Sequence, residues 1–115
     1  MHLFVYGTLK RGQPRHPFLA AQTFVAVAVT RPLYRMLNVG DYPALVRHSA
    51  GRSIAGELWD VDEDCVRTLD RVEGSDAGLY VREPVELLPP HESLSAVTYL
   101  YQQSVAGLAD CGTRW

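Results

Sequence analysis

Only one stretch of the sequence has the pattern of an amphipathic helix, and this limits the folds open to the chain. Asp62 is a favourable N-cap, and Glu63 and Asp64 place negative charge in the first turn, where the helix dipole favours it. The helix is predicted to run to about Glu73, and Gly74 supplies its C-terminal stop. With a single firm helix, most of the core has to come from strands.

Short apolar and β-branched stretches, separated by glycine and proline, fill most of the remaining chain. Strands are predicted over residues 2–5, 23–30, 34–39, 42–47, 53–61, 79–88 and 94–101, with a short helix over 18–21. No repeat or linker divides the 115 residues, so a single domain over 1–115 is expected. Together these elements predict an α+β fold in which a strongly curved sheet or small barrel packs on the helix.

Charge and hydropathy exclude several kinds of partner. The net charge is -2 and the basic residues are scattered, so the chain has no basic face of the kind that binds nucleic acid. No apolar run approaches the roughly 20 residues of a membrane span, and no signal-type stretch opens the sequence. We therefore expect a cytoplasmic protein without nucleic-acid or membrane partners. The sequence leaves its oligomeric state open.

Glu73 is the only acid expected on the apolar side of the predicted helix. With about 100° per residue, Cys65, Val66, Leu69 and Val72 fall within an arc of about 120° that also contains Glu73. An end-of-helix glutamate that frays into solvent is the alternative. If the carboxylate faces the apolar wall beside the negative helix end, its pKa should be raised. A raised pKa would suit a general base working near neutral pH.

A glycine-marked loop, Tyr6-Gly7-Thr8-Leu9, follows the first predicted strand. Backbone N–H groups that are freed where a strand ends can converge on an anion or a developing oxyanion, and Gly7 permits a close approach. A purely structural glycine turn is the alternative. The Lys-Ser/Thr pair of a phosphate-binding P-loop is absent after Gly12.

The remaining reactive side chains show no catalytic spacing. The four histidines are dispersed, so no metal site is expected. Ser53 lies in a segment one residue too long for a Gly-x-Ser-x-Gly elbow. Cys65 lies on the apolar helix stripe and Cys111 in an expected tail, and both are interpreted as free thiols. Tyr99 and Tyr101 share one face of a strand, where core packing and a substrate-facing hydroxyl are both open.

Six short sequence motifs follow one another along the chain, at residues 4–12, 40–45, 56–59, 69–74, 80–82 and 97–101. They read FVYGTLKRG, GDYPAL, GELW, LDRVEG, YVR and VTYLY. Together they resemble the γ-glutamylcyclotransferase-like family, particularly its γ-glutamylaminecyclotransferase branch. The resemblance covers nearly the whole chain and implies a small mixed β-barrel with flanking helices around a cavity for a γ-glutamyl group.

The resemblance also implies a reaction and a set of site residues. Glu73 matches the family's catalytic acid/base. The residues expected to bind the substrate are Tyr6, Gly7, Thr8, Leu9, Tyr80 and Tyr101. The implied reaction is an internal transamidation that converts a γ-glutamyl amine or γ-glutamyl amino acid into 5-oxoproline and a free amine, without metal or cofactor. Between Glu73 and Tyr80 the chain has one residue more than the family usually has, so a longer rim beside the site is expected.

Three hypotheses for the function follow. The first is an enzyme of γ-glutamylcyclotransferase type. The second is a non-catalytic module that binds a γ-glutamyl or ammonium compound and uses Glu73 to hold the ammonium group. The third is a pathway-specific enzyme that removes a γ-glutamyl protecting group. The presence of both Glu73 and the complete loop favours catalysis, whereas nothing in the sequence identifies the leaving amine.

Overall fold

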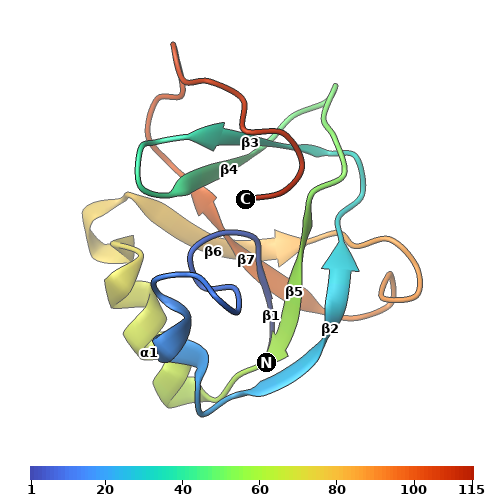
Figure 1. Cartoon of the computed structure of the whole chain (residues 1–115), viewed down its shortest axis with the longest axis vertical. Helices are drawn as coiled ribbons and strands as arrows, with labels where there is room; N and C mark the ends of the chain where they lie inside the picture. Colours follow the sequence, from blue (N-terminus) through green and yellow to red (C-terminus); the bar gives the residue numbers. More distant parts are fainter.

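A five-stranded mixed sheet with β1 (His2–Val5) at its centre forms the middle of the molecule (Figure 1). The computed structural model describes all residues from 1 to 115. The strand order is β2-β5-β1-β7-β6, and β1 runs antiparallel to β5 and parallel to β7. The other strands of this sheet are β2 (Thr23–Val29), β5 (Ala55–Asp60), β6 (Tyr80–Val85) and β7 (Ala96–Tyr101).

The two faces of this sheet are covered by different elements. One face packs against a second, antiparallel sheet of β3 (Tyr34–Asn38) and β4 (Pro43–Arg47). The other packs against helix α1 (Glu63–Val72) and the 3-10 turn η1 (His16–Leu19). A second 3-10 turn, η2 (Ser75–Ala77), follows α1.

Strand β1 contributes to both halves of the core because successive side chains of a strand point to opposite faces. Leu3 and Val5 lie in the cluster that includes Leu69 of α1. Phe4 lies in the cluster that includes Met36 of β3. The chain therefore leaves β1 between the two layers, and the loop that follows has walls on both sides.

Helix α1 begins and ends where the sequence predicts. The Asp62 side chain accepts a hydrogen bond from the Cys65 N–H at 2.8 Å, and Glu73 is the C-cap. Gly74 has a φ of 70°, a left-handed conformation that favours glycine after a helix. Cys65 and Leu69 are buried, which confirms the predicted apolar side.

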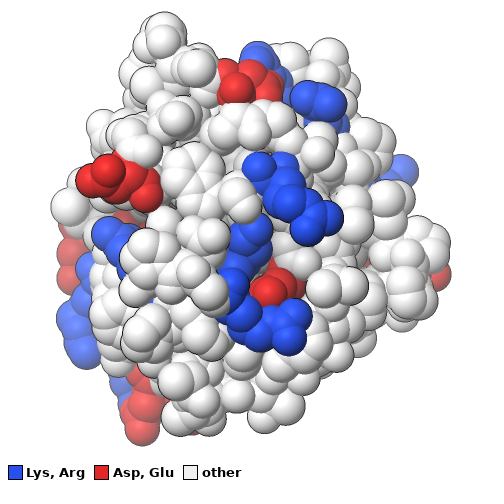
Figure 2. Space-filling view, viewed as in Figure 1, with Lys and Arg blue, Asp and Glu red and all other residues white.

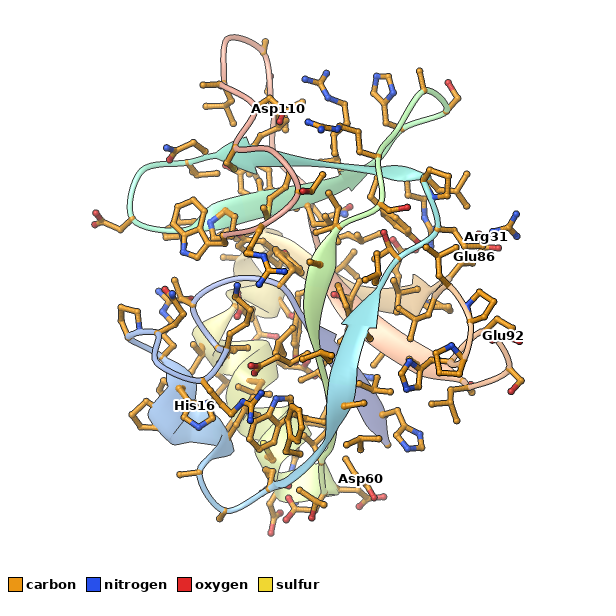
Figure 3. The ribbon with its side chains drawn as sticks, turned by 45° about the vertical axis from the view of Figure 1, so that its right-hand side comes forward. His16, Arg31, Asp60, Glu86, Glu92 and Asp110 are labelled. Carbon is orange, nitrogen blue, oxygen red and sulfur yellow. The ribbon has the colours of Figure 1, made fainter.

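The predicted α+β fold with a mixed sheet is confirmed, but the sheet does not close into a barrel. Its edge strands β2 and β6 meet only at one corner, through an isolated bridge between Thr30 and Leu87. Arg31 and Glu86 form an ion pair beside this bridge, at 3.6 Å (Figure 3). Pro84 in β6 has no N–H group to donate to a further strand. The sheet is thus strongly curved and open.

Two smaller sequence predictions differ from the structure. The predicted helix over 18–21 is the 3-10 turn η1, which contains Pro17. The strand predicted over 79–88 ends at Val85, and the cis Pro89-Pro90 bond lies in the connection that follows. No helix in the structure combines the length and apolar character that a bilayer crossing requires.

The C-terminal segment packs on the domain, so the expectation that Cys111 lies in a tail is wrong. Asp110 bridges to β3 and binds Arg35 at 3.0 Å (Figure 3). Cys111 and Trp115 pack against the core cluster, and the Trp115 carbonyl accepts a hydrogen bond from Lys10 Nζ at 2.8 Å. Burial of these apolar side chains stabilises the segment in place.

Candidate active site

A pocket that is partly open to solvent lies where β1 leaves the sheet. Its walls come from the loop after β1, the start of β4, the C-terminal end of α1 and the start of β6. Among the residues that the sequence singled out, those lining it are Tyr6, Gly7, Thr8, Leu9, Glu73, Tyr80 and Tyr99. The fold therefore brings the glycine-marked loop and the helix-end carboxylate together in one cavity.

Glu73 lies in this pocket with only 8% of its surface exposed. Burial raises the pKa of its carboxyl group to about 7, and the nearby charge of Arg15 opposes part of that rise. No hydrogen bond from the chain stabilises the carboxylate. A buried acid without a partner is costly for folding, and such groups are concentrated at functional sites. The fraying alternative for Glu73 is therefore wrong.

The loop after β1 is held through its carbonyl groups, which leaves its N–H groups available. The Thr8 carbonyl accepts a hydrogen bond from the Arg15 N–H at 2.8 Å, and the Leu9 carbonyl contacts the His16 ring nitrogen at 3.1 Å. The N–H groups of Gly7, Thr8 and Leu9 donate to no other group of the chain. Consecutive unused N–H groups beside a cavity are suited to bind an anion.

Gly7 is required by the close packing of this loop on β4. A Cβ atom at Gly7 would lie 2.6 Å from Cγ of Pro43. The Pro43 carbonyl accepts a hydrogen bond from the Tyr80 hydroxyl at 2.7 Å. The loop, β4 and β6 are therefore fixed relative to one another at the pocket wall.

A buried glutamate of β5 anchors the outer part of the loop. Glu57 accepts hydrogen bonds from the Arg11 N–H and Nε, both at 3.0 Å, and from Trp59 Nε1 at 3.2 Å. Burial raises the pKa of Glu57, but these hydrogen bonds outweigh that effect and the net pKa is lowered. Glu57 is thus an ionised anchor outside the pocket, and the sequence reasoning missed it.

A chain of hydrogen-bonded tyrosines links the pocket to helix α1. The Tyr6 hydroxyl donates to the Tyr99 carbonyl at 2.6 Å, and the Tyr99 hydroxyl donates to Asp70 at 2.7 Å. Asp70 also binds Arg82 at 3.0 Å. Burial raises the pKa of Tyr6 and Tyr99, so both stay neutral hydrogen-bond donors.

The structure separates two expected features from the pocket. Tyr101 does not line it, and its ring packs edge-on against Tyr80 with 5.2 Å between the ring centres. The segment from 74 to 79 contributes no lining residue, so it does not form the expected longer rim. The lining residues that sequence reasoning did not assign to a site are Phe4, Val5, Arg15, Tyr42 and Pro43.

The thiols lie outside the pocket. Cys65 and Cys111 are not disulfide-bonded, and burial raises the pKa of both. A raised pKa makes a thiol a poorer nucleophile at neutral pH. No group of three or more His, Cys, Asp or Glu side chains is arranged to hold a metal ion.

Two curated relatives resemble the chain in sequence. Gamma-glutamylaminecyclotransferase of Rattus norvegicus is 40% identical over 81 residues, which cover 64% of this chain and 54% of that protein. The Homo sapiens protein of the same name is 40% identical over 88 residues, which cover 70% of this chain and 57% of that protein. The chain thus spans just over half the length of these relatives.

Solved structures show the same fold. An AIG2-like protein from Mus musculus matches with a TM-score of 0.70 and 31% identity, over 90% of this chain and 76% of that one. Protein ytfP from Escherichia coli matches with a TM-score of 0.73 and 26% identity, over 98% of this chain and 93% of that one. The family model described as "Gamma-glutamyl cyclotransferase, AIG2-like" matches residues 3–115. The chain therefore belongs to the gamma-glutamyl cyclotransferase, AIG2-like family, as the resemblance of its sequence blocks predicts.

Proposed function

We propose that this protein converts γ-glutamyl amines or γ-glutamyl amino acids into 5-oxoproline and the free amine, with Glu73 as general acid/base. One observation carries the proposal: a buried carboxylate with a pKa of about 7 lines the same pocket as three unused backbone N–H groups. Family membership supports the same reaction class.

The first half of the reaction forms the ring. Glu73 takes a proton from the α-ammonium group of the substrate, and the freed amine attacks the γ-carbonyl carbon. A carbon–nitrogen bond forms, and the electron pair of the carbonyl moves onto its oxygen. The N–H groups of Gly7, Thr8 and Leu9 are placed to stabilise this oxyanion.

The second half releases the products. The oxyanion re-forms its carbonyl, the bond to the leaving nitrogen breaks, and Glu73 returns its proton to that nitrogen. Glu73, again a base, then takes the extra proton from the ring nitrogen, which ends as the neutral N–H of 5-oxoproline, and this second proton leaves with the amine as an ammonium ion. Because the nucleophile and the carbonyl belong to one molecule, the protein needs mainly to fold the substrate into attack geometry. The cavity walls around the loop, with Tyr80 and Tyr6, serve this purpose.

The test is release of 5-oxoproline from γ-glutamyl amino acids, γ-glutamyl-ε-lysine and simple γ-glutamyl amines, followed by mass spectrometry. We expect turnover of at least one class. An N-acetylated γ-glutamyl substrate should give no 5-oxoproline, because its α-nitrogen is no longer a free nucleophile. The proposal would be overturned if none of the substrates with an unmodified α-amine gave 5-oxoproline. Hydrolysis of the acetylated substrate to N-acetylglutamate would overturn it as well.

The pH profile provides an independent prediction. The base must be deprotonated, and burial raises the pKa of Glu73 to about 7. We therefore expect kcat/KM to rise about tenfold per pH unit below pH 7 and to level off above it. Steady-state kinetics between about pH 5 and 9, with circular dichroism to check folding, will measure this limb. A flat profile across neutrality would contradict a catalytic Glu73.

A further inference from the structure

Arg15 is the only basic residue that lines the pocket, and its charge lowers the pKa of Glu73 although the two side chains form no direct ion pair. Several other arginines of the chain form ion pairs with carboxylates. These are Arg11, Arg31, Arg35, Arg67 and Arg82. The Arg15 N–H group holds the loop through the Thr8 carbonyl, whereas its guanidinium group donates no hydrogen bond to the chain. Arg15 is half-buried, and its guanidinium group keeps its hydrogen-bond donors available for a ligand.

The pocket has a buried inner end and a more open mouth, and Arg15 belongs to the mouth. Glu73, Thr8 and Leu9 are buried. Arg15 and Tyr42 are half-buried, with the Arg15 guanidinium 5.6 Å from the centre of the Tyr42 ring. The two side chains thus form a charged and an aromatic wall at the opening.

The surface around the loop is locally basic although the whole chain carries a net charge of -2. Figure 2 shows basic side chains gathered over the middle of the face where the loop after β1 lies in Figure 1. Arg114 is near enough to Lys10 to help lower its pKa, although burial is the larger cause. Such a cluster attracts anionic ligands to this face of the molecule.

We propose that Arg15 binds a carboxylate on the leaving amine, so that γ-glutamyl amino acids are preferred over γ-glutamyl amines that lack this group. This inference rests on the proposed function. Glu73 has to reach the α-amine, which places the glutamyl group at the inner end. The leaving amine then lies at the mouth, between Arg15 and Tyr42. A guanidinium group can bind a carboxylate with two parallel hydrogen bonds, and the Tyr42 ring can cover the adjoining carbon atoms.

The test compares γ-glutamylalanine with γ-glutamylethylamide, which differ only in the carboxylate of the leaving amine. We expect the unmodified protein to favour the alanine substrate roughly ten- to hundredfold in kcat/KM. Arg15→Gln should lower the ratio of kcat/KM for the alanine substrate to kcat/KM for the ethylamide to about one, and Arg15→Lys should keep part of this preference. Arg67→Gln, on the exposed surface of α1, is the matched control and should leave kcat/KM unchanged for both substrates.

The assay is run above about pH 8, because loss of Arg15 is expected to raise the pKa of Glu73 further. An equal loss on both substrates would overturn the inference, since it would place Arg15 on the glutamyl group or in a structural role. Equal turnover of the two substrates by the unmodified protein would overturn it as well. Absence of 5-oxoproline from every substrate with the unmodified protein would instead contradict the proposed function. A thermal unfolding curve for each variant checks that the variant is folded.

Discussion

Replacing Glu73 with glutamine is expected to lower kcat for 5-oxoproline release by about 10²- to 10⁴-fold while the protein stays folded. Glutamine keeps the shape of the side chain but can neither take the proton of the α-ammonium group nor return it to the leaving amine. The change also removes a buried charge that has no hydrogen-bond partner in the chain. The effect is measured by steady-state kinetics on a substrate that the unmodified protein turns over, and circular dichroism checks that the variant is folded.

The same variant should be more stable than the unmodified protein above neutral pH. Folding raises the pKa of Glu73 from 4.5 to about 7, so the folded state binds more protons than the unfolded state between these values. The free energy of unfolding therefore falls as the pH rises through this window. Glu73→Gln should abolish that fall and gain about 1 to 3 kcal/mol at pH 8, measured by urea unfolding. A loss of both activity and stability would instead indicate a structural role.

Glu63→Gln is the matched control, because Glu63 lies on the same helix and its side chain is 96% exposed. It should leave turnover unchanged. Asp70→Asn is less neutral, because Asp70 accepts a hydrogen bond from the pocket residue Tyr99 at 2.7 Å. We expect a loss much smaller than that of Glu73→Gln. Near-normal turnover by Glu73→Gln would contradict the proposal that Glu73 is the general acid/base.

Helix α1 could be predicted from the sequence because its signals are local. A cap, a charged first turn, a period of 3.6 residues and a terminal glycine lie within 13 residues of one another, from 62 to 74. The same periodicity places Glu73 on the buried side, which the structure confirms. The chemical role of Glu73 stays a proposal, because burial and a raised pKa make a base available without identifying its substrate.

The pairing of the strands could not be predicted in the same way. Alternation and β-branched residues indicate that a strand exists, but the partner of a strand depends on residues far along the chain. Closure of the barrel is such a property, because it depends on hydrogen bonds between β2 and β6. These strands approach each other only at Thr30 and Leu87.

The residues missed at the site are those whose role depends on distant neighbours. Arg15 resembles an ordinary surface arginine until the fold places it beside Tyr42. Glu57 offered a weak signal, because it lies two residues from Trp59 and therefore on the same face of β5. A glutamate on the same strand face as a large aromatic residue indicates either that the glutamate has a buried partner or that the strand is predicted wrongly. Arg11 is that partner.

Gly7→Ala is expected to lower kcat/KM by about 10²- to 10³-fold, because it disturbs the N–H groups proposed to hold the oxyanion. The φ of Gly7 is not positive, so alanine suits the backbone. The obstacle is Pro43, whose Cγ and Cδ atoms would lie 2.6 and 2.8 Å from the new Cβ. Either the loop or the start of β4 has to move, and movement of about 1 Å at a reacting centre is costly. The measurement is kcat/KM for 5-oxoproline release.

A second substitution separates this mechanism from general unfolding. In the double variant Gly7→Ala, Pro43→Ala, the ring atoms that obstruct the new methyl group are gone. The Pro43 carbonyl that accepts the Tyr80 hydroxyl at 2.7 Å belongs to the backbone and remains. We therefore expect the double variant to recover at least about tenfold of the lost kcat/KM, and Pro43→Ala alone to lose little. Full activity of Gly7→Ala would show that the loop position does not limit catalysis. A folded but unrescued double variant would show that Gly7 is needed for something other than clearance from Pro43, such as direct contact of its Cα with the substrate.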